Sequence, residues 1–300
     1  MGKKIDGRAE RVVAEHPIAF VLGGGGVRGA VEIGMVRALF EAGIRPDLVV
    51  GTSIGAINGA LIAKDPTLGC IEPLLDAWTS PEANAVYGSS LFTQMSRLVK
   101  TKTHLNSHDP LRHLLEASLG EATRFEDLEV PLQVVAANIE RAAEHVFDSG
   151  PLIPAILASA SVPGLFPPTL IDGEHFIDGG IVNSIPIEQA VASGAARIFV
   201  LQVGRVETPL VAPSSAVDTA RVAFEIARRH RFARDLATLP VDVDLYVLPT
   251  GGPLEGDDTL RSYRKMETVR LRIEQAYEAS RDFLIDRGLA SAPLMTGDED

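Results

Sequence analysis

Residues 48–55 read Leu-Val-Val-Gly-Thr-Ser-Ile-Gly, and this stretch indicates the architecture of the chain around it. Its apolar start predicts a buried strand, and the run at 54–63 that follows has the composition of a helix. The pattern Gly-x-Ser-x-Gly between them is typical of a nucleophile elbow, a strained turn that exposes a serine hydroxyl. Gly51 and Gly55 leave room for backbone to pack against such a turn without Cβ clashes. Ser53 is therefore the candidate nucleophile, placed where a helix N-terminus favours developing negative charge.

A glycine-rich loop lies upstream, where residues 23–29 read Gly-Gly-Gly-Gly-Val-Arg-Gly directly after the apolar run 18–22. Consecutive glycines allow the backbone to turn several N–H groups towards one point, as an oxyanion hole requires. Arg28 adds a fixed positive charge beside the loop, which can steady it or attract a negatively charged head group. The candidate oxyanion site consists of Gly24, Gly25, Gly26 and Arg28.

A carboxylate motif lies downstream, where Asp178 follows the apolar segment 175–177 and precedes Gly179 and Gly180. The two glycines allow other backbone to come close, so they support the site as Gly51 and Gly55 do. Asp178 is the candidate base for the Ser53 hydroxyl. An aspartate with its ordinary pKa of about 3.9 is a weak base for serine, so burial would have to raise that pKa.

Together these motifs resemble the patatin-like phospholipases, which combine a Gly-Gly-Gly-x-(Arg/Lys)-Gly loop, a Gly-x-Ser-x-Gly elbow and an Asp-Gly-(Gly/Ala) motif. The block Ala158–Pro168, Ala-Ser-Ala-Ser-Val-Pro-Gly-Leu-Phe-Pro-Pro, is similar to the family's Ala-Ser-x-x-x-Pro block, and the resemblance extends over residues 17–203. It implies an α/β protein with a three-layer α/β/α core and a mostly parallel sheet. It also implies a serine lipid acyl hydrolase with a Ser53–Asp178 dyad.

The wider pattern agrees with an α/β fold, because strands and helices alternate at the start of the chain. The first four elements are strand 17–22, helix 29–43, strand 47–52 and helix 54–64. Further strands are predicted at 132–138, 144–147, around Phe176 and at 197–203, with an edge strand at 241–248. Further helices are predicted at 155–161, at 211–239 with an apolar side of Val217, Phe224, Ala227 and Leu236, and at 260–284.

We expect one catalytic domain over residues 17–288, an N-terminal extension at 1–16 and a flexible tail at 289–300. Residues 80–120 are predicted to be mostly helical. Their apolar stripe at 91–99 is typical of a core, and a helical cover over the site is the alternative. The arginines of helix 211–239 indicate a solvated face. A basic contact for lipid phosphates is the alternative for Arg221, Arg228, Arg229, Arg231 and Arg234.

The residues leave three alternative interpretations open. A Ser-Asp-His triad needs a histidine after Asp178, and His230, among arginines, is the one that follows it. The spacing of Gly24, Gly26 and Gly29 fits a dinucleotide loop, but the second strand ends without the acidic residue that would hold a ribose. A lipid- or acyl-binding module without catalysis would keep the same loops.

The amino-acid composition limits the classes of partner and the location that we expect for this protein. The formal net charge of −12 argues against a general nucleic-acid binder, and 46% hydrophobic residues suit an α/β core. The lone Cys70 suits a reducing compartment and a core position. Five prolines in the uncharged stretch 150–171 argue against a membrane span. We expect a cytoplasmic enzyme for a lipid or ester substrate, with transient membrane-surface contact and with no metal or cofactor; the pattern makes no prediction of the oligomer.

Overall fold

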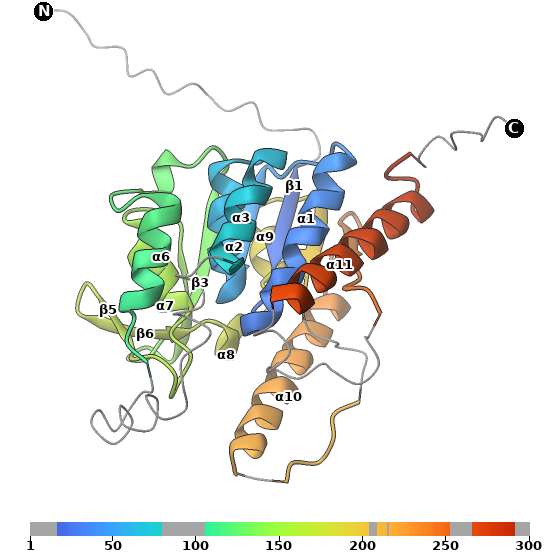
Figure 1. Cartoon of the computed structure of the whole chain (residues 1–300). Coiled ribbons are helices and arrows are strands. Elements are labelled where there is room, and N and C mark those ends of the chain that lie inside the picture. The colour runs from blue at the N-terminus through green and yellow to red at the C-terminus, as the bar shows by residue number, and fades with distance from the viewer. Residues whose placement is uncertain (1–16, 80–105, 204–208, 215, 253–265, 292–300) are drawn as a thin grey trace, which may run out of the picture.

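The computed structural model describes residues 17–79, 106–203, 209–214, 216–252 and 266–291. Its centre is a mixed, mostly parallel sheet with helices on both faces (Figure 1). This confirms the predicted three-layer α/β/α fold.

The strands of the sheet follow the order β5-β6-β3-β2-β1-β7-β8, and β4 pairs with β3. The pairs β1–β2, β1–β7, β2–β3 and β7–β8 are parallel, whereas β4, β5 and β6 join by antiparallel pairing. The predicted edge strand is confirmed as β8, and the short β5 was not predicted. The strands are β1 (Ile18–Leu22), β2 (Leu48–Thr52), β3 (Leu132–Asn138), β4 (Ala143–Phe147), β5 (Thr169–Ile171), β6 (Glu174–Asp178), β7 (Arg197–Leu201) and β8 (Asp244–Val247).

Alternate side chains of the central strands enter two separate cores, which defines the layers. Phe20 and Leu22 lie in the larger core, whereas Ala19 and Val21 lie in the smaller one, as the two-residue period of a strand requires. The larger core is covered by α1 (Val31–Glu41), α2 (Ile54–Lys64), α3 (Ile71–Thr79), α6 (Asp109–Leu119), α7 (Leu152–Ser159) and α11 (Met266–Asp286). The opposite face carries α8 (Gly180–Asn183), α9 (Ile187–Ala192) and α10 (Ala216–Ala237). Short 3-10 turns lie at η1 (Gly26–Ala30), η2 (Leu68–Cys70) and η3 (Phe125–Asp127).

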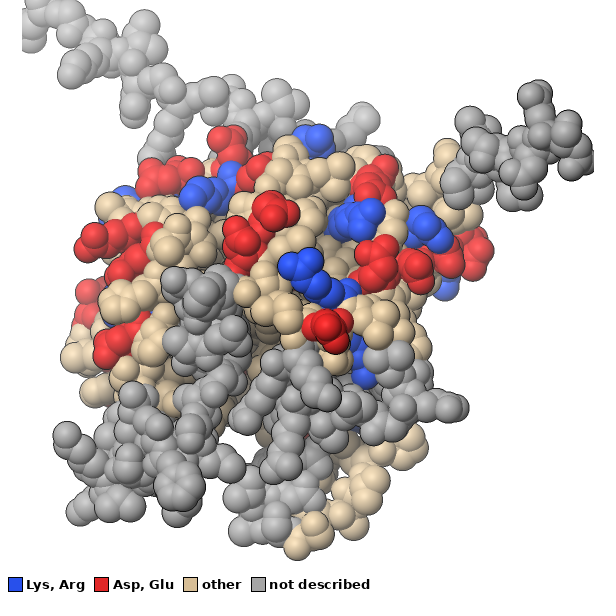
Figure 2. All heavy atoms as spheres, viewed as in Figure 1, with Lys and Arg blue, Asp and Glu red and all other residues tan. Residues whose placement is uncertain are grey.

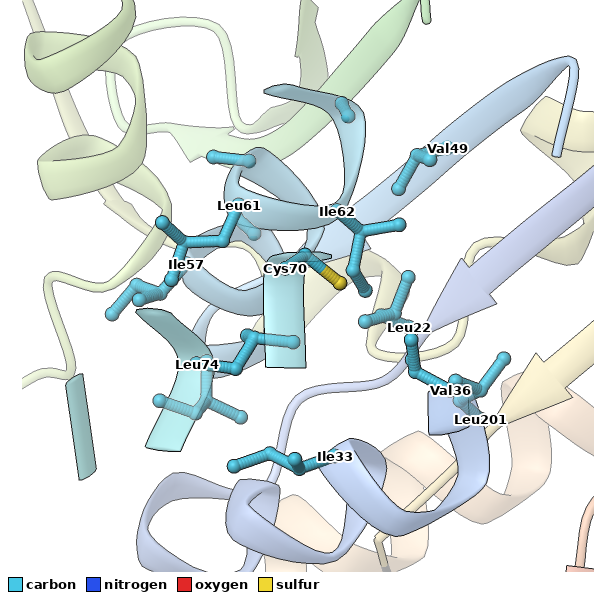
Figure 3. Packing of buried hydrophobic residues seen from close by; sticks show 14 of the residues in the cluster. Leu22, Ile33, Val36, Val49, Ile57, Leu61, Ile62, Cys70, Leu74 and Leu201 are labelled. Carbon is cyan, nitrogen blue, oxygen red and sulfur yellow. The ribbon is translucent and has the colours of Figure 1, made fainter. Parts of the chain in front are cut away.

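The larger core contains the single cysteine. Figure 3 shows Cys70 among Leu22, Ile62 and Leu74, and the residue is 1% exposed. Burial raises the pKa of its thiol to about 12, so the thiol stays protonated and inert at neutral pH. The prediction that Cys70 is a small core residue is confirmed.

The segment 80–120 is described only from residue 106 onwards, so the apolar stripe at 91–99 lies outside the described residues. Within the described part, α6 contributes four buried leucines to the larger core. At the other end of the chain, Leu289 and Ala290, which the expected tail included, pack against the same core.

The buried side of α10 differs from the predicted one. Phe224 and Leu236, expected on the apolar side, are 37% and 38% exposed, and Ala227 is exposed as well. Among the side chains of α10 that the structure describes, which do not include the predicted Val217, the buried ones are Val222, Arg228, Phe232 and Asp235. The apolar pattern failed because ion pairs allow charged residues to be buried: Arg228 pairs with Glu225 at 3.0 Å, and Arg231 pairs with Asp235 at 3.2 Å and Glu188 at 2.6 Å.

Acidic and basic side chains lie side by side over the helices of the face seen in Figure 2. In the part of the chain that the structure describes, no helix is long and apolar enough to cross a membrane.

Candidate active site

The register of the sheet brings the predicted nucleophile and base together. β4 pairs with one side of β3 along 134–138, so β2 and β6 must share the other side. There, the last residue of β2 lies opposite Val135, and Asp178 at the end of the antiparallel β6 lies opposite Ala136. The two strands therefore meet end to end, and Ser53 directly follows the end of β2.

Ser53 occupies the strained turn that the sequence predicted. Its backbone has φ 57° and ψ −120°, a left-handed conformation that costs a residue with a Cβ on the order of 1–3 kcal/mol. The side chain is 7% exposed, and its hydroxyl donates a hydrogen bond to Asp178 Oδ2 at 2.5 Å. Ser53 is also the N-terminal cap position of α2, so the free N–H groups of that helix lie beside it.

Glycines make the turn possible through close approach of backbone. A Cβ on Gly51 would collide with the carbonyl of Gly55, and a Cβ on Gly55 would collide with the carbonyl of Leu22 in β1. Behind the carboxylate, a Cβ on Gly179 would collide with the carbonyl of Val135. The elbow and the aspartate motif are therefore both packed directly on neighbouring strands.

Asp178 is held by hydrogen bonds on both of its oxygens. Oδ2 accepts the Ser53 hydroxyl, and Oδ1 accepts the N–H of Gly180 at 2.7 Å. Burial raises the pKa of this carboxyl to about 6, although the hydrogen bonds from Ser53 and Gly180 act in the opposite direction. Desolvation thus supplies the stronger base that a direct Ser–Asp pair requires.

The glycine loop separates into an anchored half and an open half. The N–H of Gly23 donates to the carbonyl of Leu201 at 3.0 Å, and the N–H of Gly24 donates to the carbonyl of Ser184 at 2.9 Å. Gly25 and Gly26 are exposed, and no acceptor takes their N–H groups within the described residues. The sequence predicted Gly24 as one of the oxyanion donors. The structure corrects this, because the N–H of Gly24 already donates to the carbonyl of Ser184.

Arg28, which the sequence predicted beside the oxyanion site, lies half-buried in η1, and this turn begins at Gly26 of the open half.

A buried polar cluster, which sequence reasoning missed, supports this loop. Asn58 Nδ2 donates to the carbonyl of Gly29 at 3.0 Å and to Glu32 Oε2 at 2.7 Å. Asn58 Oδ1 accepts the Trp78 indole N–H at 3.1 Å. Glu32 is fully buried in α1, and burial raises the pKa of its carboxyl. A glutamate inside the apolar run Val31–Val36 was the available signal.

The structure does not assemble the alternative triad. His230 is exposed on α10, and no described histidine forms a hydrogen bond with Ser53 or Asp178.

A second residue that sequence reasoning missed is Ser159, whose hydroxyl accepts the N–H of Ser53 at 2.8 Å. It lies inside the quoted block Ala158–Pro168, but the pattern assigned it no role.

The fold and this site define an α/β protein with a serine on a strand–turn–helix elbow, hydrogen-bonded to a buried aspartate. The family model described as Patatin-like phospholipase matches residues 20–191. The chain belongs to the patatin-like phospholipase family, as its motifs predicted.

Individual relatives match about two thirds of the chain. The chain is 33% identical over 206 residues to Patatin-like phospholipase domain-containing protein 7 of Rattus norvegicus, covering 68% of this chain and 15% of that protein. It is 32% identical over 209 residues to Lysophospholipase NTE1 of Candida glabrata, covering 68% of this chain and 12% of that protein. The chain thus spans a small part of the length of these relatives. The crystal structure of VipD from Legionella pneumophila superposes with a TM-score of 0.49 at 16% identity, covering 91% of this chain and 67% of that chain.

Proposed function

We propose that this protein is a serine acyl hydrolase that cleaves lipid or other carboxylic esters, of the phospholipase A, lysophospholipase or carboxylesterase type. The observation that carries the proposal is the hydrogen bond of 2.5 Å between the strained Ser53 and the buried Asp178. Family membership and the printed names of the relatives, phospholipase and lysophospholipase, support the same class of reaction.

In the first half of the reaction, Asp178 Oδ2 takes the hydroxyl proton as Ser53 Oγ attacks the ester carbonyl carbon. The carbonyl oxygen becomes an oxyanion, which the N–H groups of Gly25 and Gly26 stabilise, since they are the open donors of the loop. The tetrahedral intermediate then collapses, Asp178 returns the proton to the leaving alkoxide, and an acyl-serine remains.

In the second half, water replaces the alcohol. Asp178 takes a proton from the water as its oxygen attacks the acyl carbonyl, and the proton returns to Ser53 Oγ when the acyl bond breaks. A carboxyl with a pKa of about 6 suits both directions, because it is ionised at neutral pH and still readily accepts a proton.

Exposed apolar side chains beside the dyad favour a lipid substrate. Ile181 directly follows the Asp-Gly-Gly motif and is 40% exposed. Phe224 of α10 is 37% exposed and lies against Gly180, since a Cβ there would be 2.9 Å from its ring. We propose that these side chains meet an acyl chain or a membrane surface in transient, peripheral contact. We further propose that the protein is cytoplasmic and that residues 17–288 form a single catalytic domain.

The test is hydrolysis of a phospholipid, a lysophospholipid, an acylglycerol and a small soluble ester by the wild type and by Ser53→Ala. We expect the wild type to cleave at least one ester and the variant to cleave none, with unchanged thermal unfolding, because truncating one hydroxyl leaves the elbow packed. Equal turnover by the two proteins would overturn the role of Ser53. Lipid binding by both without any hydrolysis would identify a binding module.

A further inference from the structure

We propose that Ser159 is a positioning residue for the dyad: its hydroxyl fixes the backbone amide of Ser53 and thereby the direction of the nucleophile. Ser159 Oγ accepts the Ser53 N–H at 2.8 Å and donates to the carbonyl of Val135 at 2.6 Å. The residue is fully buried at the end of α7. The proposal rests on the proposed function, because it concerns the same nucleophile.

The Ser53 amide needs such a partner. With φ 57°, Ser53 lies outside the helical region and its N–H precedes the hydrogen-bonded turns of α2, so the helix supplies no acceptor for it. A non-glycine residue keeps a left-handed conformation only where the surroundings hold it there. The Ser159 hydroxyl is well suited to hold it, since its proton is committed to Val135 and a lone pair therefore faces the amide.

The same short segment also holds the other member of the dyad. The N–H of Asp178 donates to the carbonyl of Ser161 at 3.0 Å, and the N–H of Gly179 donates to the carbonyl of Ser159 at 3.3 Å. Residues 159–161 thus contact the backbone of the serine through a side chain and the backbone of the aspartate through two carbonyls. Loss of the Ser159 hydroxyl would therefore remove the hydrogen bond to the Ser53 amide and leave the two backbone hydrogen bonds to Asp178 and Gly179 in place.

Because the Ser159 side chain contacts only the serine of the dyad, its removal should have a specific effect on the kinetics. The Ser159 side chain is fully buried, so it does not contact substrate, and its loss should leave KM almost unchanged. The hydrogen bond from Ser53 to Asp178 depends on the direction of the Ser53 side chain, and a misplacement of about 1 Å costs on the order of 10²-fold in rate. Ser159→Ala should therefore lower kcat by about 10- to 100-fold.

The experiment measures kcat and KM on one soluble ester, the rate of labelling by a fluorophosphonate probe, and thermal unfolding. Ser280→Ala is the matched control: Ser280 is also fully buried and donates to a backbone carbonyl, that of Pro249, at 3.2 Å, but it lies on α11. Ser159→Thr and Ser159→Val form a second pair, since they have nearly the same shape and only Thr keeps the hydroxyl. Wild type and Ser53→Ala are assayed in parallel.

We expect Ser159→Ala to lose kcat and labelling rate in similar proportion while Ser280→Ala keeps both, and Thr to exceed Val in kcat at position 159. A Ser159→Ala protein with wild-type kcat and labelling rate would overturn the proposal, as would equal kcat values of the Thr and Val variants. If the wild type hydrolyses no ester, or if Ser53→Ala remains active, the proposed function fails instead.

Discussion

Asp178 and Glu32 are both buried carboxyl groups near the nucleophile, and they differ in what surrounds their oxygens. Burial raises the pKa of both. Asp178 has a partner on each oxygen, and one of these partners is the hydroxyl of Ser53. Glu32 has a partner on Oε2 alone, the amide of Asn58, and its buried Oε1 has none within the described residues.

The partners of the two carboxyls indicate different roles. The two donors of Asp178 stabilise a carboxylate, so its pKa rises only to about 6 and the group remains a base. The burial of Glu32 is complete, and it raises the pKa of that carboxyl well above its ordinary value, although the hydrogen bond from Asn58 acts in the opposite direction. A buried carboxyl is therefore a catalytic candidate when its hydrogen bonds come from the groups that react, and a structural one when they come from a side-chain amide beneath a loop.

The largest effect expected from this comparison is that of replacing each carboxyl by its amide. Asp178→Asn should lower kcat/KM by between about 10² and 10⁴, because an amide cannot take the serine proton. Glu32→Gln should keep turnover within about threefold of the wild type, because the amide has nearly the same shape and its oxygen can accept the same hydrogen bond from Asn58. Steady-state kinetics of both variants on one soluble ester checks this. A large loss in Glu32→Gln with normal unfolding would mean that Glu32 takes part in catalysis.

The next largest effect on turnover is expected from a substitution in the glycine loop. Gly25→Ala should lower kcat more than it raises KM, by about 10²-fold, because the new Cβ would collide with Val203 and displace the open donors. Gly252→Ala is the control, since a Cβ there meets open space. If Gly25→Ala raised KM alone, the loop would be a binding surface for substrate rather than an oxyanion hole.

The pH dependence of turnover sharpens the account of Asp178. Because the base must be ionised, kcat/KM of the wild type should rise about tenfold per pH unit up to about pH 6 and level off above it. The profile on a soluble ester between pH 4.5 and 8 measures this. An inflection near pH 4 would show an aspartate with an ordinary pKa, and burial would then not explain its basicity.

The smallest effect concerns the stability contributed by Glu32. Its folded-state pKa is raised above the unfolded value, so the folded state binds the proton more tightly and loses stability as pH rises through that interval. Gln does not ionise. The Tm of Glu32→Gln relative to the wild type should therefore increase from pH 4 to pH 8, and a difference that stays constant over this range would contradict a raised pKa of Glu32.

Local patterns were sufficient to predict much of this molecule. The alternation of strands and helices predicted an α/β fold, the resemblance to the patatin-like phospholipases implied its three layers, and the glycine spacing around Ser53 predicted the strained turn. What the patterns missed depends on tertiary pairing. The carbonyl of Ser184 accepts the N–H of Gly24, and the amide of Asn58 donates to the buried Glu32. An ion pair with Glu225 accompanies the burial of Arg228 on α10. The spacing of residues along the sequence does not predict such tertiary partners.

The central claim is that Asp178 activates Ser53 without a histidine, and labelling by a fluorophosphonate probe followed by peptide mapping tests it most directly. We expect the probe on Ser53, at equal rates in the wild type and in His230→Ala, and at a rate at least about 10²-fold lower in Asp178→Asn. A probe attached to another residue, or a similarly large loss of labelling in a folded His230→Ala protein, would contradict the dyad.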